Sequence, residues 1–145
     1  MSKKEYQPKF IYFAASWKHK HAVELLTEYY RERGFLVNSF VELEGQFETS
    51  EHGPGISLDQ WINSPDGEKC FRFDIDSAMG ADLVIYIGPS GTDAWAEVGA
   101  AYAKGVPIFA LYAKGEQSGL MRRMVSKWFD DYLSCFEASV KLLRP

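Results

Sequence analysis

The sequence predicts an α/β protein built on a doubly wound parallel sheet of about five strands, with helices on both faces. Short runs of branched and aromatic residues alternate along the chain with stretches of helical periodicity, which is typical of this class. The strand candidates are apolar at nearly every position, as strands buried on both faces are. The length of 145 residues, 46% of them hydrophobic, suits one domain with a substantial core. We therefore expect residues 1–145 to form one domain.

The first part of the chain predicts two strands, a helix and a long loop. Residues 9–14 predict the first strand, and apolar side chains three and four positions apart predict a helix over residues 20–33. Residues 36–41 are a plausible second strand. Residues 43–68 contain four Gly, two Pro and no sustained periodicity. They predict a long loop, which is either part of a binding site or a surface insertion.

The rest of the chain continues the alternation. Helices are predicted over residues 69–80, 94–104, 121–129 and 136–143. Buried strands are predicted at residues 82–87 and 106–112, with a short strand possible between the last two helices. This alternation favours the flavodoxin-like strand order 2-1-3-4-5.

Composition excludes several classes of function. Sixteen Lys and Arg against 20 Asp and Glu give a net charge of -4, so a globally basic nucleic-acid-binding protein is excluded. The polar start and the short apolar run at residues 11–15 fit neither a signal peptide nor a membrane span. We expect a cytoplasmic protein with no membrane or nucleic-acid partner. Cys70 and Cys135 lack metal-ligand spacing and are expected to be reduced structural thiols.

The turn at residues 88–93 joins a buried strand to the start of a helix. Ligands of such sheets bind beyond the carboxyl ends of the strands, and backbone N–H groups of this turn could hold an anion there. The turn lacks the Lys-Ser/Thr end of a phosphate-binding loop and the three-glycine dinucleotide motif, which disfavours an ATPase or a conventional dehydrogenase. A Gly-x-Ser-x-Gly motif is also lacking, so acyl transfer is not indicated.

Carboxylates near these strand ends are the first candidates for chemistry. Glu97 lies one helical turn after Asp93, where the helix dipole favours an ionised group, whether as a nucleophile or as simple dipole compensation. Asp74 falls on a helix stripe that should face the core, so it is either functional or structurally paired. Trp61 could stack on a heterocycle or fill the core. Ser16 could bind an anion or cap a helix.

Several segments appear in an order that resembles a known family. They are YFAAS at residues 12–16, Asp74 ahead of ADLVI at residues 81–85, Gly91-Thr92, and EVGAAYAKGVPI at residues 97–108, which is the most specific. Together they resemble the nucleoside 2-deoxyribosyltransferase family and the related 2'-deoxynucleoside 5'-phosphate N-hydrolases. The likeness spans most of the chain, but the loop at residues 43–68 is unmatched.

The resemblance implies a covalent route through the sugar, without a metal or redox cofactor. Glu97 corresponds to the glutamate that attacks C1', and Asp74 to the acid that handles the proton of the base. Tyr12 corresponds to the tyrosine that orients the nucleophile, and Asp93 to an acid that contacts the sugar hydroxyls. The segment between Gly91 and Glu97 is longer than the family's common spacing.

Other positions matter if the substrate carries a 5'-phosphate. The resemblance places the hydroxyls of Ser16 and Ser90 near the 5' end of the substrate. A phosphate there would need anion donors near Ser16, Ser90 or Ser118, and Gly91 of the turn is also expected to bind substrate. Arg122 and Arg123 could join them or face solvent. Trp95, within the longer spacing, could narrow the pocket. Related enzymes assemble as dimers or larger oligomers, so we expect a homo-oligomer that acts on a small nucleoside or nucleotide.

The sequence leaves the type of function open at two levels. Attack by a second base or by water decides between a transferase and a hydrolase. Two other classes are a non-catalytic nucleotide-binding or sensor module on the same fold, and an NAD-cleaving enzyme similar to TIR domains. Release of free base, or of nicotinamide, discriminates between these alternatives.

Overall fold

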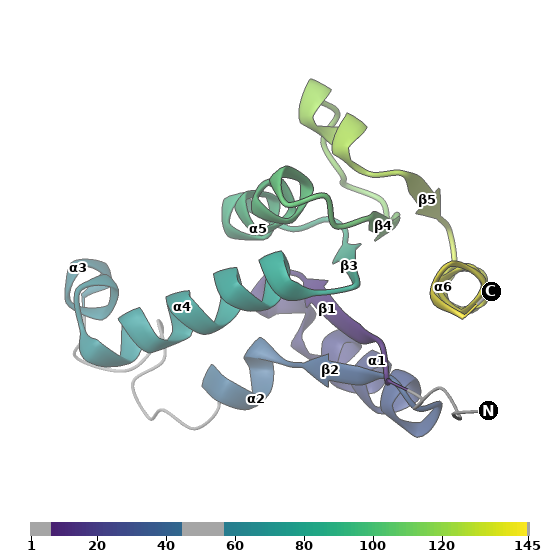
Figure 1. Ribbon diagram of the computed structural model, residues 1–145. Helices are drawn as coiled ribbons and strands as arrows, with labels where there is room; N and C mark the ends of the chain where they lie inside the picture. Colours follow the sequence, from purple (N-terminus) through teal and green to yellow (C-terminus); the bar gives the residue numbers. More distant parts are fainter. Residues whose placement is uncertain (1–6, 45–56, 145) are drawn as a thin grey trace.

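A five-stranded parallel sheet forms the middle layer of the protein (Figure 1). The computed structural model describes residues 7–44 and 57–144. The strands are β1 (Phe10–Ala14), β2 (Leu36–Asn38), β3 (Leu83–Ile87), β4 (Ile108–Leu111) and β5 (Lys127–Phe129). All four pairings are parallel, in the order β2-β1-β3-β4-β5. The predicted flavodoxin-like order is confirmed.

α1 (Lys20–Glu32) and α6 (Tyr132–Leu143) cover one face of the sheet. Tyr30 of α1 is buried at the centre of this layer. Its ring centre lies 5.4 Å from that of Phe13 in β1 and 5.1 Å from that of Phe136 in α6, both with edge-to-face geometry. These aromatic contacts join both helices to the sheet.

α4 (Pro65–Gly80) and α5 (Thr92–Ala103) cover the opposite face. Successive side chains of a strand point to opposite faces, so Tyr12 of β1 and Tyr86 of β3 point toward α4 and α5. The neighbours of these tyrosines along each strand belong to the core under α1 and α6. The alternation therefore brings two tyrosine hydroxyls to the side of the sheet where α5 lies.

β2 is shorter than the strand predicted over residues 36–41. It ends at Asn38, and α2 (Phe40–Glu44) begins shortly after it. The first two residues of α2 are buried in the same core cluster as Val37 of β2. The apolar run thus stays in the core while its backbone becomes helical, because six residues are too few for periodicity to separate a strand from a helix.

The loop predicted over residues 43–68 is partly helical. α3 (Leu58–Ile62) and the first turn of α4 lie within it. Ser57 and Gln60 form a capping box at the start of α3, and Ser64 accepts a hydrogen bond from a backbone N–H of the first turn of α4. These capping side chains start two helices where periodicity is weak. The middle of the predicted loop lies outside the described residues.

The helix predicted over residues 121–129 is wrong. A 3₁₀ helix, η2 (Leu120–Met124), and the strand β5 occupy this segment. The backbone N–H and the hydroxyl of Ser126 both donate to the carbonyl of Ile108, at 2.8 Å each, which fixes β5 beside β4. Strand pairing at the edge of the sheet therefore overrides the helical pattern.

The cysteines agree with the prediction of structural thiols. Cys70 and Cys135 are both buried. Burial raises the pKa of the Cys135 thiol to about 11, so this thiol stays protonated at neutral pH. Among the helices of the described ranges, none has the length and apolar character needed to cross a membrane.

Candidate active site

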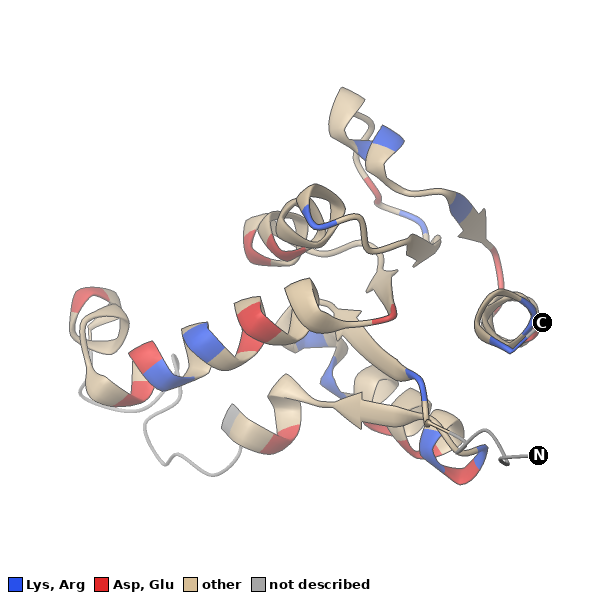
Figure 2. Ribbon diagram, in the orientation of Figure 1, with Lys and Arg blue, Asp and Glu red and all other residues tan. Residues whose placement is uncertain are grey.

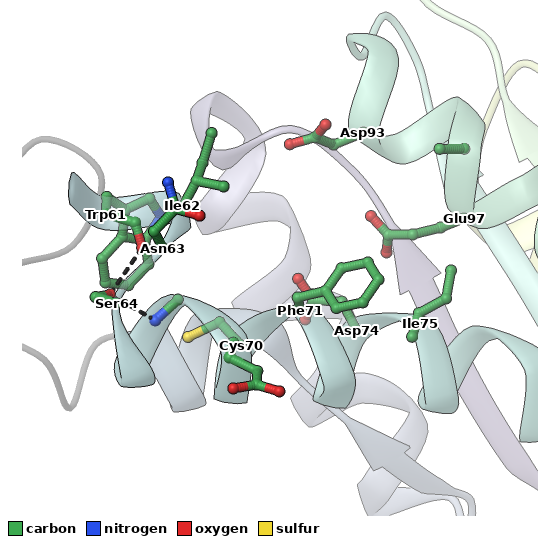
Figure 3. A pocket seen from close by; sticks show the side chains of 13 residues that line it. Trp61, Ile62, Asn63, Ser64, Cys70, Phe71, Asp74, Ile75, Asp93 and Glu97 are labelled. Carbon is green, nitrogen blue, oxygen red and sulfur yellow. Dashed lines mark hydrogen bonds between the residues drawn. The ribbon is translucent and has the colours of Figure 1, made fainter. Parts of the chain in front are cut away.

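A cavity of about 650 Å³ lies between α3, α4 and α5 (Figure 3). This volume is within the range of small-molecule sites. Four carboxylates line it, together with apolar and small polar side chains. The acidic members are Glu68, Asp74, Asp93 and Glu97. Figure 2 shows acidic residues on both α4 and α5, the helices that supply all four.

Glu97, which lines this cavity, is hydrogen-bonded to Tyr12. Tyr12 is fully buried in β1, and its hydroxyl donates a hydrogen bond to Oε1 of Glu97 on α5. The two residues are 85 positions apart in the sequence. The parallel order of β1 and β3, with α5 following β3, brings them together. The structure therefore contains the predicted contact between this tyrosine and this glutamate.

Asp74 and Asp93 line the same cavity from two helices. Figure 3 shows the carboxylates of Asp74 and Glu97 both directed into the space between α4 and α5. Asp93 lies in the first turn of α5, one helical turn before Glu97, and is exposed. The three acids singled out from the sequence therefore converge on one space instead of lying in separate crevices.

Trp61 belongs to the wall that α3 contributes. Its side chain lines the cavity and is 9% exposed. α3 packs closely on α4, because a Cβ at Gly67 would lie 2.0 Å from the carbonyl oxygen of Trp61. The Ser64 hydroxyl donates to this same carbonyl and accepts from the Gly67 N–H, as the dashed lines of Figure 3 show. The wall that carries Trp61 is therefore fixed by backbone contacts.

Ser16, Ser90 and Gly91 form a hydrogen-bonded group at the ends of β1 and β3. The Gly91 N–H donates to the Ser16 hydroxyl oxygen at 2.7 Å, and the Ser16 N–H donates to the Ser90 hydroxyl oxygen at 2.9 Å. Ser16 precedes η1 (Trp17–His19), yet its side chain makes no capping bond there. These residues lie together, but they do not line the cavity. Ser118 lies in the exposed segment after β4 and does not line it either.

Trp95 does not narrow the cavity. It lies two residues before Glu97, about 200° around the helix, on the other side of α5. Its indole N–H donates to the Tyr86 hydroxyl at 3.0 Å, and the two ring centres are 4.4 Å apart. Arg122 lies over the Trp95 indole at 4.2 Å and donates to Glu116 at 3.0 Å. The expectation for Trp95 is therefore wrong, and Arg122 is engaged within the protein.

Some lining residues were missed by the sequence analysis. Glu68, Asn63 and Ile62 all fall in the segment expected to be a loop. The Ser-Pro pair at residues 64–65 is the signal that could have placed Glu68 on α4, because Ser is a preferred N-cap and Pro a preferred first helical residue.

Within residues 7–44 and 57–144, no group of three or more His, Cys, Asp or Glu side chains is arranged to hold a metal ion. His19 is half-buried and its Nε2 lies 2.6 Å from the Pro89 carbonyl oxygen. His21 is exposed, and His52 lies outside the described residues.

The fold of this chain is similar to that of several solved structures. No protein-family model matches the sequence, and no curated protein is significantly similar to it. A 2-deoxyribosyltransferase from Bacillus psychrosaccharolyticus is similar in structure, with a TM-score of 0.65 and 21% identity over 87% of this chain and 89% of that one. A CMP N-glycosidase from Clostridium botulinum has a TM-score of 0.57 and 19% identity over 89% of this chain and 99% of its own.

A conserved protein from Enterococcus faecalis has a TM-score of 0.65 and 17% identity over 94% of this chain and 100% of its own. Sequence identity is low in all three cases, and the structural likeness covers nearly the whole length of each compared protein. The chain therefore has the flavodoxin-like α/β fold that a 2-deoxyribosyltransferase and a CMP N-glycosidase also have.

Proposed function

We propose that this protein is an enzyme of the nucleoside 2-deoxyribosyltransferase type. It cleaves or exchanges the N-glycosidic bond of a (2'-deoxy)nucleoside or its 5'-monophosphate. The fold shared with a deoxyribosyltransferase and a CMP N-glycosidase supports this class of substrate. The observation that carries the proposal is the convergence of Glu97, held by Tyr12, and Asp74 on one cavity.

The first step forms a covalent ester. The Glu97 carboxylate attacks C1' of the sugar, and the C1'–N bond breaks with its electron pair passing to the base. Asp74 in its protonated form gives a proton to the ring nitrogen of the departing base. The Tyr12 hydroxyl fixes the direction of the attacking carboxylate. The products of this step are a neutral base, an ionised Asp74 and a sugar esterified to Glu97.

The second step releases the sugar. A ring nitrogen of a second base, or a water molecule, attacks C1' of the ester and restores the Glu97 carboxylate. Asp74 takes the proton that the incoming group loses, so it returns to its starting form. A second base as acceptor gives a transferase and water gives a hydrolase.

The remaining predicted site residues bind the substrate. Asp93 contacts the sugar hydroxyls from the first turn of α5, and Trp61 lies against the base from the wall of α3. Ser16 and Ser90, hydrogen-bonded to each other and to Gly91, do not line the cavity, so they contact only a 5' end or a 5'-phosphate that extends beyond it.

We also propose that the single domain over residues 1–145 works as a homo-oligomer in the cytoplasm. Two large apolar side chains at the cavity, Ile62 and Phe71, are 58% and 57% exposed. Exposed apolar groups beside a binding site are often covered by a partner. A second copy that covers them would shield the cavity from water.

A chromatographic screen for released base tests the proposed function. Purified protein is incubated with nucleosides and their 5'-monophosphates, with and without a second free base. The proposal predicts free base from at least one substrate, and Glu97→Ala removes the activity while the protein still unfolds in a single cooperative thermal transition. Ligand binding without base release in long incubations would contradict it, and liberation of nicotinamide from NAD alone would favour an NAD-cleaving enzyme.

A further inference from the structure

The hydroxyl of Tyr86 joins three segments at one atom. Tyr86 is fully buried in β3, and its oxygen accepts hydrogen bonds from the Ser90 N–H at 2.8 Å and from the Trp95 indole N–H at 3.0 Å. The hydroxyl in turn lies 2.6 Å from Oε2 of Glu116, to which it donates. The turn after β3, the helix α5 and the segment after β4 are thus bonded to one another through this group.

Glu116 is the anchor of this cluster. Its side chain is only 5% exposed, and its other carboxylate oxygen accepts from Arg122 at 3.0 Å. A Cβ at Gly88 would lie 2.6 Å from Oε2 of Glu116, so the carboxylate packs directly against the backbone of the turn. A buried carboxylate with two such donors resists displacement, because breaking either bond leaves a buried charge undercompensated.

The cluster holds α5 from the side opposite the cavity. Trp95 and Glu97 point to opposite sides of this helix because they are two residues apart. Trp95 is fixed by its bond to Tyr86 and by the Arg122 guanidinium that lies over its ring. Glu97 is held on the other side by the Tyr12 hydroxyl. The helix turn that carries the carboxylate is therefore restrained from both sides.

We propose that Tyr86 and Glu116 are positioning residues for the Glu97 carboxylate. Neither of them lines the cavity, so they act through Trp95 and through the turn that precedes α5. This inference rests on the proposed function, in which Glu97 is the nucleophile. A displacement of about 1 Å at a reacting group costs on the order of a hundredfold in rate, so a cluster that prevents it matters for kcat.

The protonation state of Tyr86 suits this role. Burial, with a further contribution from the hydrogen bond to Glu116, raises the pKa of Tyr86 to about 12. The phenol therefore stays protonated over the neutral range. Its O–H donates a hydrogen bond to Glu116, and its oxygen accepts hydrogen bonds from the Ser90 N–H and the Trp95 indole N–H.

Three variants and one matched control test the inference. Tyr86→Phe removes the shared hydroxyl, Glu116→Ala removes the anchor, and Glu116→Gln keeps an acceptor at nearly the same place. The control is Tyr30→Phe, which removes another fully buried hydroxyl, 3.1 Å from that of Ser139, on the opposite face of the sheet. The control shows how much the loss of a buried hydrogen bond far from Glu97 changes kcat and hydrogen–deuterium exchange.

The readouts are kcat and KM for base release, and hydrogen–deuterium exchange of residues 88–97. We expect Tyr86→Phe and Glu116→Ala to lower kcat about ten- to a hundredfold with KM changed less than about twofold. Glu116→Gln should keep most of the kcat that Glu116→Ala loses. Exchange over residues 88–97 should be faster in Tyr86→Phe than in Tyr30→Phe.

Two results would overturn the inference. One is a kcat for Tyr86→Phe no lower than that of Tyr30→Phe, and the other is unchanged exchange over residues 88–97. If the unaltered protein releases no base from any substrate, the proposed function fails. The exchange measurement then still decides whether Tyr86 and Glu116 hold the start of α5.

Discussion

At the scale of single residues, Glu97 has the surroundings that a nucleophilic carboxylate needs. It lines the cavity from the second turn of α5, and it accepts a hydrogen bond from a fully buried phenol. That bond restricts the rotation of the carboxylate before substrate arrives. Orientation of a reacting group before binding lowers the barrier of the chemical step.

Tyr12→Phe tests this orientation. The variant keeps the ring that packs in the core but loses the hydroxyl that holds Glu97. We expect kcat to fall about ten- to a hundredfold with little change in KM, because only the direction of attack is lost. Steady-state kinetics measures it, and Tyr102→Phe, which alters an exposed tyrosine of α5, serves as the control. Equal kcat values for the two variants would contradict the role of Tyr12.

Asp74→Asn tests the acid. An amide cannot deliver the proton that the departing base needs, so kcat on an ordinary nucleoside should fall about 10²- to 10⁴-fold. An N-ribosyl pyridinium leaves as a neutral base without a proton, and its cleavage should be affected far less. Kinetics on the two substrates makes the comparison. Equal losses on both would show that Asp74 binds substrate and does not act as an acid.

At the scale of elements, the contact of α3 with α4 shapes the cavity wall. Gly67→Ala puts a Cβ 2.0 Å from the carbonyl of Trp61, so α3 must move or α4 must distort. We expect a loss of about 1–3 kcal/mol in the free energy of unfolding, together with weaker substrate binding, because α3 carries Trp61. Urea denaturation and KM are the measurements.

Gly80→Ala is the matched control for this prediction, because it lies at the other end of the same helix and a Cβ there meets no atom within 4 Å. It should leave the free energy of unfolding nearly unchanged or slightly higher. A Gly67→Ala variant as stable as Gly80→Ala would contradict the close packing of α3 on α4.

The sequence predicts long, strongly patterned elements better than short ones. β1, β3, β4, α1 and α5 are found near their predicted places, because their apolar patterns repeat over enough residues to identify them. β5 has only three residues and becomes a strand through its pairing with β4. The local sequence pattern does not predict this pairing. α3 depends on its capping box, a local signal that is independent of periodicity.

The candidate site residues also differ in how far the sequence predicts them. Glu97, Asp74 and Tyr12 could be named as candidates because they lie in or beside segments that resemble a family. The Tyr86–Glu116 contact joins residues 30 positions apart, and it depends on where the segment after β4 folds back. A tyrosine in an otherwise aliphatic strand is the available signal, because a buried phenol needs a hydrogen-bond partner. The identity of that partner requires the structure.

At the scale of the whole molecule, two buried phenols and one buried thiol make the free energy of unfolding depend on pH in the alkaline range. Burial raises the pKa of Cys135 from 9.0 to about 11 and that of Tyr86 from 10.0 to about 12, and the pKa of Tyr30 also rises. The unfolded chain therefore loses these protons first as the pH increases. The stabilisation is complete below pH 9 and is lost as the pH rises through the folded-state values.

We therefore expect the urea midpoint to fall steadily between about pH 9 and pH 12. Tyr30→Phe should reduce the steepness of this fall, since it removes one of the buried phenols. Tyr102→Phe, at an exposed position, should leave the steepness unchanged. A midpoint that does not change over this range would contradict the account of these buried groups.

The fold as a whole assembles the chemistry from distant parts of the chain. β1 supplies Tyr12, α4 supplies Asp74, and α5 supplies Asp93 and Glu97. None of these elements carries a complete site. The doubly wound order places β1 beside β3, and α4 and α5 pack on one face of the sheet, so the three acids meet at one cavity and Tyr12 reaches Glu97.

Identification of the residue that carries the sugar tests the central claim most directly. The protein is mixed with a substrate, quenched in acid within the first turnover, digested and examined by mass spectrometry. The proposal predicts that the mass of one deoxyribosyl or ribosyl group, with its 5'-phosphate where the substrate carries one, is added to the peptide that contains Glu97, and that the addition disappears in Glu97→Gln. Base release with no sugar on any peptide, or with sugar on a peptide that lacks Glu97, would contradict it.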